Sequence, residues 1–479
     1  MSDPEREAHE KATLLQPPER VLATLNADGT RRWIRPRLSR GRYYLLRRSL
    51  AWVLMVVFVA VPHLRVGGAP LILLDIPARE FTLFGTVFRP TDTALLMLLL
   101  LGILVGIFLV TALLGRAWCG WACPQTVYME FLFRPLERLF EGSPQEQQKL
   151  DRVGGSWRRW LKNAVFALIA CFLAHTFLAY FVGWEQLIRW IRGSPAEHPV
   201  AFLVMAGVTA AMVFDFLWFR EQTCLVACPY GRFQSVLLDR DSLIVGYDVA
   251  RGEPRGKPGK RRKGLPLADE DAKARGDCID CRACVLTCPT GIDIRDGLQM
   301  ECIHCTQCID ACDAIMERIG RPKGLVRYCS QRELSGEGRR ILRPRVLVYA
   351  GLLLVFATLL AIGLSRRGGA RVTVLRGLRE PFSELPTGEV VNQVRVKIGN
   401  QTRESRSYRI AVEGLAPDQV VAPENPLPVA AGALRETTLF IKLPEAVFHG
   451  TGKKVVAIVV EDGAGFRART EATLLGPKE

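Results

Sequence analysis

Five long apolar runs constrain the fold of this chain more than any other feature of its sequence. Each has roughly the 20 residues that an α-helix needs to cross the hydrocarbon of a bilayer. The runs lie near Ser49–Leu64, Thr93–Leu114, Asn163–Val182, Val200–Phe219 and Val346–Leu364. Because lipid offers no partners to backbone polar groups, we expect each run to form a membrane-spanning helix. The chain is therefore predicted to be an α-helical polytopic membrane protein with about five spans.

Arginines between these runs indicate how the helices are oriented. They crowd the segment before the first run and the connection after the second, whereas the loops after the first and third runs carry few. Cationic loops stay on the cytoplasmic side. We expect a multi-pass protein of the bacterial inner membrane, with a cytoplasmic N-terminus and region 220–345, and with periplasmic C-terminal residues. The net charge is +16, but the basic residues flank apolar runs and form no recognisable nucleic-acid-binding module. We therefore expect no nucleic-acid partner.

The residues after the fifth run follow a different pattern. Apolar and polar side chains alternate in Val391–Ile398 and Val455–Val460, and turn signals such as Asp462-Gly463 separate such runs. Alternation of this kind is typical of strands with one buried face. Several short strands predict a C-terminal β-sandwich of immunoglobulin type, for which an interaction or stability role is the simplest expectation.

Eight cysteines between the fourth and fifth runs repeat one spacing twice. Each copy reads Cys-x2-Cys-x2-Cys-x3-Cys, starting at Cys278 and at Cys302. In two-cluster bacterial ferredoxins the fourth cysteine of each copy ligates the other cluster. We therefore assign one [4Fe–4S] cluster to Cys278, Cys281, Cys284 and Cys312, and a second to Cys302, Cys305, Cys308 and Cys288. Zinc also uses Cys-x2-Cys pairs, but it seldom needs this tandem spacing.

Two further cysteine pairs form CxxxCP motifs, Cys119/Cys123 and Cys224/Cys228, each just after an even-numbered apolar run. Residues four apart share one face of a helix, and the repeat suggests a duplicated two-helix unit whose four thiols converge. Soft thiolates favour Cu(I), which needs few ligands. A third iron–sulfur centre, reversible dithiols and simple packing at helix ends stay open as alternatives.

For some single residues the sequence gives a less specific prediction. Asp215 lies near the end of the fourth run, where it could orient a metal ligand, move protons or pair with Arg220. His304 lies between cluster ligands; it could tune a cluster by hydrogen bonding, but an exposed side chain is the simpler expectation. Cys171 is expected to be a packed thiol, and Cys329 lies outside the cluster spacing.

The segments Gly115–Arg138, Trp218–Gly256 and Cys278–Tyr328 resemble the FixG/CcoG/RdxA family of accessory proteins for cbb3-type cytochrome c oxidase. This resemblance covers nearly the whole chain. It implies two [4Fe–4S] clusters and an oxidoreductase that reduces Cu(II) to Cu(I) for assembly of the oxidase. The resemblance also implies which residues bind copper and act as catalytic residues. They are Cys119, Cys123, Cys224 and Cys228.

The expected organisation has six parts. They are a cytoplasmic segment (1–48), a four-helix membrane domain (49–248), a basic linker (249–277), a ferredoxin-like insert (278–330), a fifth span (346–364) and the β domain (372–479). We expect the lipid bilayer, an unidentified electron donor, and copper-delivery or oxidase-assembly proteins as partners. A quinol-linked electron-transfer subunit and a redox-sensing scaffold without turnover are the alternative functions.

Overall fold

The computed structural model describes residues 23–25, 30–66, 68–84, 86–88, 92–256, 276–365, 368–377, 380–402 and 404–477. The chain divides into unit 1, with Met1–Val66, Pro70–Phe84 and Asp92–Leu359, and unit 2, with Gly67–Ala69, Gly85–Thr91 and Leu360–Glu479. Much of the predicted segment 1–48 and most of the predicted linker 249–277 lie outside the described residues.

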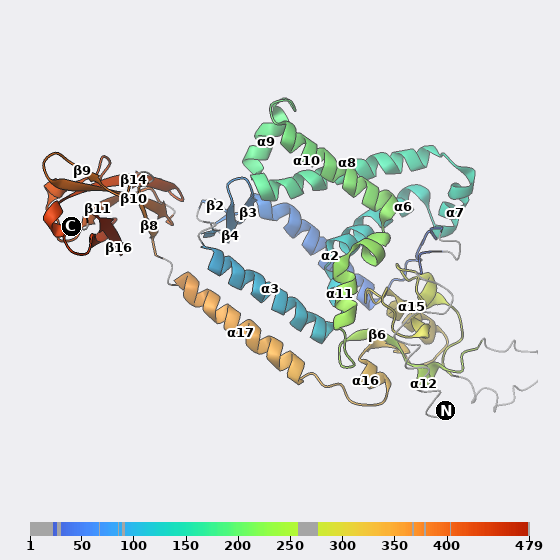
Figure 1. Cartoon of the computed structure of the whole chain (residues 1–479). Helices are drawn as coiled ribbons and strands as arrows, with labels where there is room; N and C mark the ends of the chain where they lie inside the picture. The colour runs from blue at the N-terminus through green and yellow to red at the C-terminus, as the bar shows by residue number, and fades with distance from the viewer. Residues whose placement is uncertain are drawn as a thin grey trace, which may run out of the picture. The chain divides into compact units, whose positions relative to one another are not determined.

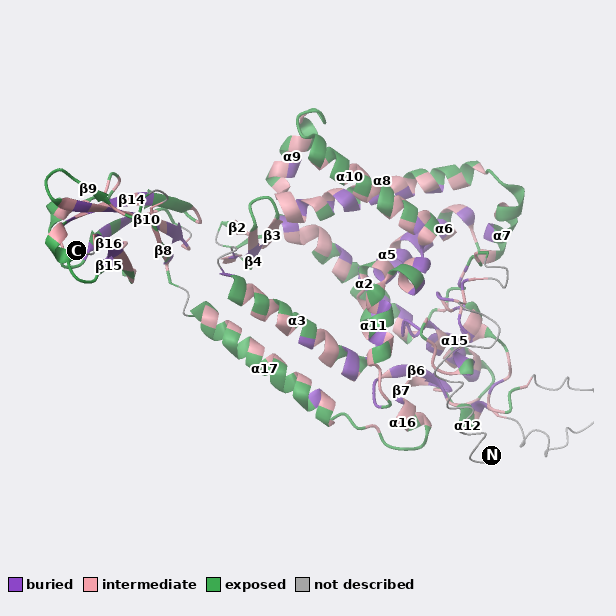
Figure 2. Cartoon of the chain, in the orientation of Figure 1, coloured by how far each residue is buried: buried purple, intermediate pink, exposed green. Residues whose placement is uncertain are grey.

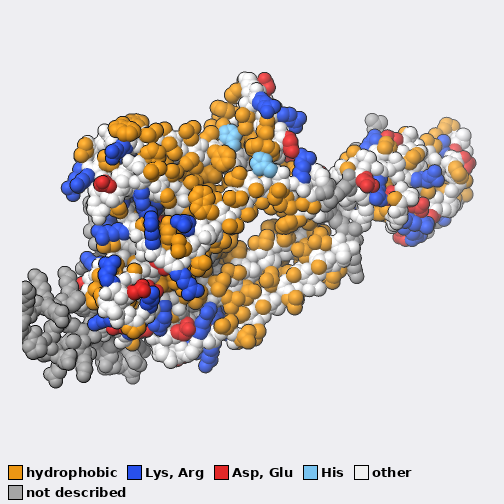
Figure 3. Space-filling model, turned by 180° about the vertical axis from the view of Figure 1, so that it is seen from behind, with side chains coloured by type: hydrophobic (Ala, Val, Ile, Leu, Met, Phe, Trp, Pro, Cys, Tyr) orange, Lys and Arg blue, Asp and Glu red, His pale blue; other side chains and the backbone are white. Residues whose placement is uncertain are grey.

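The predicted five long apolar helices are confirmed (Figure 1). They are α2 (Arg42–Ala60), α3 (Thr93–Leu114), α8 (Trp157–Val182), α10 (Pro199–Phe214, continued by the π-turn Asp215–Phe219) and α17 (Pro344–Ser365). Their outer faces expose large apolar side chains, such as Leu100, Leu203 and Leu354 (Figure 2). In water such faces would be costly, whereas a bilayer solvates them, so the chain is a multi-pass membrane protein. Figure 3 shows these apolar side chains spread over the helices.

The first helix begins at Arg42 rather than near Ser49, so part of the arginine-rich segment is helical. Shorter elements connect the long helices: α4 (Ala117–Trp121), α5 (Pro124–Tyr128), a π-turn (Met129–Phe133), α6 (Arg134–Glu141), α7 (Pro144–Val153), α9 (Trp184–Arg192), a π-turn (Thr223–Ala227) and α11 (Pro229–Leu237). Strands β3 (Ile72–Asp75) and β4 (Glu80–Leu83) form a hairpin between α2 and α3.

A small ferredoxin-like module completes unit 1. It has β6 (Ile244–Tyr247) paired antiparallel with β7 (Val326–Cys329), and the short helices α12 (Val249–Gly252), α14 (Ala283–Leu286), α15 (Gln307–Arg318) and α16 (Gln331–Leu334). Its apolar core includes Val245, Ile292, Ile309 and Met316. Figure 2 shows buried residues concentrated in this module and in the short helices next to it.

Unit 2 is the predicted all-β immunoglobulin-like domain. One sheet has β8 (Ala370–Arg376), β9 (Ser383–Glu384), β10 (Glu389–Asn400), β12 (Val420–Val421) and β14 (Leu434–Pro444). The other has β11 (Arg406–Val412), β13 (Leu427–Val429), β15 (Lys453–Glu461) and β16 (Arg467–Leu475). Alternate residues of β10 are buried, as the sequence pattern predicts, and Ile398, Leu439 and Ile458 lie in the shared core.

Candidate electron-transfer site

The eight cysteines of the ferredoxin-like module separate into two groups, as their spacing predicts. The outer site is defined by Cys278, Cys281, Cys284 and Cys312, and the inner site by Cys302, Cys305, Cys308 and Cys288. The fourth cysteine of the second copy, Cys312, interacts electrostatically with Cys278 and Cys281 of the first copy. Conversely, Cys288 of the first copy interacts with Cys302, Cys305 and Cys308 of the second. These interactions are compatible with crossed ligands, although Cys284 also interacts with Cys308, and the assignment of ligands to each cluster stays a prediction.

The backbone of the two copies turns in the same way. Asp280 and Arg282 flank Cys281 with φ of 49° and 56°, and His304 and Thr306 flank Cys305 with φ of 54° and 63°. Left-handed backbone on both sides of a cysteine is rare for residues other than glycine. Its recurrence at matching positions shows that both loops curl around a common kind of centre.

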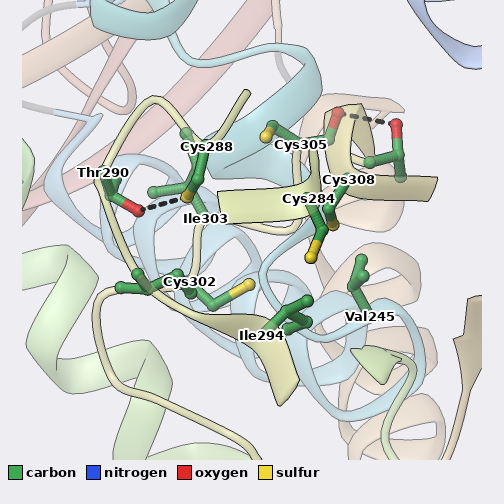
Figure 4. Close-up of a pocket in the computed structure, with 11 residues that line it drawn as sticks. Val245, Cys284, Cys288, Thr290, Ile294, Cys302, Ile303, Cys305 and Cys308 are labelled. Atoms are coloured by element: carbon green, nitrogen blue, oxygen red, sulfur yellow. Dashed lines mark hydrogen bonds between the residues drawn. The ribbon is translucent and has the colours of Figure 1, made fainter. Parts of the chain in front are cut away.

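A cavity at the inner site shows how these residues fit a cluster. It is lined by the inner-site cysteines with Cys284, Thr290, Thr306 and apolar side chains such as Ile294 and Val245. Figure 4 shows thiols of the inner site directed into this cavity, where Cys288 lies 3.3 Å from the Thr290 hydroxyl. Among the described residues, no three His, Cys, Asp or Glu side chains are close enough to hold a single metal ion. Four thiols around an apolar cavity suit a cubane, which binds one thiolate at each iron, better than one zinc ion.

Helix α15 of the module is fixed to the start of α2. The Asp310 carboxylate accepts hydrogen bonds from the backbone N–H groups of Tyr43, at 3.1 Å, and Tyr44, at 2.7 Å. The N-cap residue of α2, Gly41, has no side chain to do this, and a β-carbon there would lie 2.4 Å from Asp310. A carboxylate at a helix N-terminus satisfies unpaired donors and the helix dipole. The module is therefore anchored to the membrane helices through defined polar contacts.

The first CxxxCP motif packs directly against the inner site. A β-carbon added at Gly120 would lie 2.5 Å from the carbonyl oxygen of Ile303 and 2.8 Å from Cα of Cys305. The side chains of Cys119, Ile303 and Cys305 form one buried apolar cluster. Beside them, Trp121 donates a hydrogen bond of 2.8 Å to the Tyr328 hydroxyl. Only glycine allows this approach, which brings Cys119 next to a proposed cluster ligand.

The four cysteines of the two CxxxCP motifs converge. We call Cys119, Cys123, Cys224 and Cys228 the thiol tetrad. Every pair of its thiols interacts electrostatically. Pro124 and Pro229 each open a new helix immediately after the second cysteine of their motif, where a missing N–H costs nothing. The duplicated motifs thus bring four thiols near enough to interact with one another electrostatically.

The environment of the tetrad favours neutral thiols. Burial, followed by the neighbouring thiols, raises the pKa of the Cys224 thiol to about 12. Burial also raises the pKa of Cys119 and of Cys123. The Cys119 thiol donates a hydrogen bond of 3.1 Å to Oε1 of Gln234, whose amide also donates to Tyr230 and Thr111. A metal that binds here must therefore displace protons from thiols in a partly dry site.

Two arginines lie between the inner site and the tetrad. Arg47 of α2 is fully buried and donates from Nε to the Gly120 carbonyl oxygen at 2.9 Å. Arg116 is 2% exposed, donates to the Met300 carbonyl oxygen, and stabilises the thiolate forms of Cys119 and Cys302. The sequence predicted a role at the site for neither residue.

His304 and Asp215 differ from the sequence-based expectations. His304 is fully buried rather than exposed, because its loop packs on the turn at Gly115 and its Nδ1 accepts the Arg116 N–H at 3.1 Å. Burial, and then Arg116, lower the pKa of His304 to about 3, so the ring is neutral. Asp215 accepts from the Thr223 hydroxyl, next to Cys224, whereas the Arg220 guanidinium binds both oxygens of Glu137 at 2.8 and 2.9 Å. The alternative pairing of the Asp215 and Arg220 side chains is therefore wrong.

Comparison with known proteins decides the family. The protein RdxA of Cereibacter sphaeroides is 35% identical over 454 residues, which cover 90% of this chain and 93% of RdxA. The nitrogen fixation protein FixG of Rhizobium meliloti is 34% identical over 433 residues, 80% of each chain. The chain belongs to the FixG/RdxA family. The resemblance seen in the sequence is thereby confirmed.

Family models and other relatives agree with this membership. Residues 219–331 of this FixG-family chain match the model described as "4Fe-4S dicluster domain", residues 96–142 match "4Fe-4S binding domain", and residues 360–477 match "IG-like fold at C-terminal of FixG". RdxB of C. sphaeroides is 35% identical over 424 residues, 84% of this chain and 86% of RdxB. A FixG-related protein from Vibrio parahaemolyticus aligns with 23% of this chain and 98% of its own, at 18% identity and a TM-score of 0.20.

This FixG-family chain is thus an iron–sulfur electron-transfer protein of the membrane. The matched residues 96–142 contain the first CxxxCP motif, and residues 219–331 contain the second with the eight cysteines of the outer and inner sites. Both motifs therefore lie within segments that match iron–sulfur family models.

Two remaining thiols lie away from these sites. The Cys171 thiol lies 3.6 Å from His175 Nδ1 within α8, and that nitrogen also lies 2.8 Å from the Cys171 carbonyl oxygen. Cys329 is buried in β7 and donates a weak hydrogen bond to the Arg327 carbonyl oxygen at 3.7 Å. Neither contacts the tetrad, so both serve as matched controls for cysteine substitutions.

Proposed function

We propose that this protein is a cupric reductase that supplies Cu(I) for assembly of a cbb3-type cytochrome c oxidase. A reduced one-electron carrier protein would give one electron to the ferredoxin-like module, and each electron would convert one Cu(II) to Cu(I) at the thiol tetrad. The observation that carries this proposal is the direct contact of Gly120, in the first CxxxCP motif, with Cys305 of the inner site. This contact supports the proposal because it brings the electron-transfer module into direct packing with the motif that carries Cys119 and Cys123.

The outer and inner sites would hold the cofactors. Two [4Fe–4S] clusters bound there would supply single electrons at neighbouring positions. The chain's own residues contribute the arrangement. Exposed Cys281 makes the outer site accessible to a protein donor, and the buried Cys302 and Cys305 keep water from the inner site. Asp310 holds the module against α2, so that the distance between inner site and tetrad stays fixed.

Copper suits the tetrad as a substrate. Cu(I) is a soft ion that thiolates bind with few ligands. The tetrad fits this because its thiols converge, yet no three described ligand side chains are close enough to enclose one ion. Two thiols at a time can therefore bind Cu(I), and the other two can receive it. Asp215, which contacts Thr223 next to Cys224, would orient this end of the tetrad and is proposed as an additional metal-site residue.

The charge distribution supports an orientation for this function. The arginine-rich segment before α2 and the connection between α3 and α8 lie on the side of the ferredoxin-like module, through contacts such as that of Arg37 with Thr287. By the positive-inside rule this side is cytoplasmic in a bacterial inner membrane. The β domain is then proposed to be periplasmic, where copper-delivery or oxidase-assembly proteins would be its partners.

Anaerobic reoxidation tests the proposal. The purified protein is reduced with dithionite, freed of excess reductant and mixed with Cu(II), and the iron–sulfur absorbance is followed with a Cu(I) chelator present. We expect rapid reoxidation with one Cu(I) per electron, and a loss of at least about tenfold in rate in a Cys119→Ala, Cys224→Ala variant. Cys171→Ala is the matched control and should react like the unaltered protein.

Three outcomes would contradict the proposal. An unchanged rate in the double variant would remove the tetrad from the reaction. Reoxidation by a quinone but not by Cu(II) would show a quinol-linked subunit instead. An iron content above that of two cubane clusters, which falls when the tetrad is substituted, would show an iron–sulfur centre in place of copper.

A further inference from the structure

We propose that Arg47 and Arg116 act as fixed positive charges that raise the reduction potential of the inner cluster above that of the outer one. They would thereby collect the electron next to the thiol tetrad. Neither residue is a cluster ligand, so both are positioning residues. The inference rests on the proposed ligand assignment and extends the proposed function by giving the electron a direction.

Arg47 is the more enclosed of the two. Its side chain has no exposed surface, and within the described part of the chain its guanidinium donates one hydrogen bond, from Nε to the Gly120 carbonyl oxygen. Both terminal nitrogens are buried without a partner. The Gly120 that it contacts packs directly on the inner site, since a β-carbon added there would lie 2.8 Å from Cα of Cys305. The unpaired end of the guanidinium therefore lies where it can compensate negative charge at Cys305.

Arg116 approaches the inner site from the turn after α3. Its backbone N–H donates to His304, its guanidinium donates to Met300, and its Nε is buried without a partner. His304 directly precedes Cys305, and Met300 lies two residues before Cys302, so both contacts are with the loop that carries the inner-site cysteines. A β-carbon at Gly231 would lie 2.9 Å from its Nη2, so the guanidinium is wedged between the two CxxxCP regions.

A buried cation without a counter-charge is costly, since the protein interior solvates charge poorly. Among the described residues, neither guanidinium has a carboxylate within ion-pair distance. Asp310 interacts electrostatically with Arg47, but its two oxygens bind the backbone N–H groups of Tyr43 and Tyr44. The nearby Glu130 already binds Arg134 and accepts a hydrogen bond of 3.0 Å from Gln307. A cubane with four thiolates is a net anion, and its negative charge grows when it is reduced. The two arginines therefore match a reduced cluster better than an oxidised one.

The outer site has the opposite surroundings. Asp280 is adjacent to Cys281 in the chain, and Asp313 is adjacent to Cys312. The buried cation Arg295 near this site is neutralised by Asp293 and Asp280, each at 2.6 Å. Exposed Cys281 also lets water screen this region. Local charge thus favours electrons at the inner site, which contacts the tetrad, over the outer site.

A redox titration of the intact holoprotein in detergent, followed by electron paramagnetic resonance, tests the inference. Arg47→Gln should lower the midpoint potential of the inner cluster and leave that of the outer cluster unchanged. Arg47→Lys should restore part of the shift, because it keeps the charge but not the planar fork. Arg48→Gln, an exposed neighbour on the same helix, is the matched control and should change neither potential.

Arg116→Gln provides an independent measurement if Arg47 variants fail to assemble, and it should shift the same cluster in the same direction. Unchanged inner potentials in Arg47→Gln and Arg116→Gln proteins with full iron content would overturn the inference. So would equal shifts of both clusters, which indicate a general structural effect. A shifted inner potential in a protein that does not reduce Cu(II) would support the inference and refute the copper function alone.

Discussion

The outer and inner sites have the same cysteine spacing and the same left-handed backbone positions, yet their surroundings differ in almost every respect. The outer site exposes Cys281 at a polar cleft with Arg255, Arg282 and Asp296. The inner site is buried against Gly120 and two unpaired arginines. One motif therefore serves two tasks, because the side that faces solvent can meet a donor and the side that faces the membrane helices can reach the tetrad.

Substituting the fourth cysteine of each copy in turn is the strongest test of this comparison. Cys288→Ser should abolish the inner cluster and spare the outer one, although Cys288 belongs to the first copy. Cys312→Ser should do the reverse, since Cys312 lies with Cys278 and Cys281. Iron analysis with electron paramagnetic resonance of each variant gives the answer. Loss of the cluster in the same copy as the substituted cysteine would show that the ligands do not cross.

Ion pairs should also contribute differently to stability in the buried and the exposed region. The Glu137–Arg220 pair lies in the buried layer near the tetrad, with side chains 8% and 6% exposed, whereas Asp280 next to the outer site is 39% exposed. Glu137→Gln leaves Arg220 buried and should lower the free energy of unfolding by about 3–5 kcal/mol. Asp280→Asn should change stability little. Denaturation of both variants in the same detergent measures the difference, and equal losses would contradict it.

The Glu137 pair also predicts a response to acid. Burial alone would raise the pKa of Glu137, but Arg220 lowers it to about 2, below the usual 4.5. At pH values between these two pKa values, Glu137 is therefore protonated in the unfolded chain but ionised in the folded chain. The stabilisation is complete above pH 4.5 and should be lost as the pH falls towards 2. Glu137→Gln should remove this part of the pH dependence, and an unchanged profile would refute it.

A smaller effect is expected where the inner site meets the tetrad. Gly120→Ala places a β-carbon against Ile303 and Cys305 and should push the two apart. Electron transfer to Cu(II) should slow by roughly tenfold, while both clusters stay assembled. Gly106→Ala in α3, where an added β-carbon meets nothing within 4 Å, is the matched control. Stopped-flow measurement of the rate of cluster reoxidation compares the two variants. Equal rates would show that electrons do not pass through this contact.

The sequence by itself determined the elements whose signals are local. Apolar length specified five helices, alternation specified the β-domain, and cysteine spacing specified which thiols group together, because each depends on neighbours along the chain. Even the convergence of the tetrad followed from the duplicated motif.

Only the tertiary structure decided what surrounds those thiols. Arg47 and Arg48 are adjacent and chemically identical in the sequence, yet one is fully buried against Gly120 and the other is exposed. His304 and Glu137 likewise gained their partners from segments far away in the chain. Burial and electrostatic pairing depend on which distant segments pack together, and no local pattern encodes that packing. The eight cysteines of the outer and inner sites could thus be predicted as two groups, but the charges that distinguish them could not.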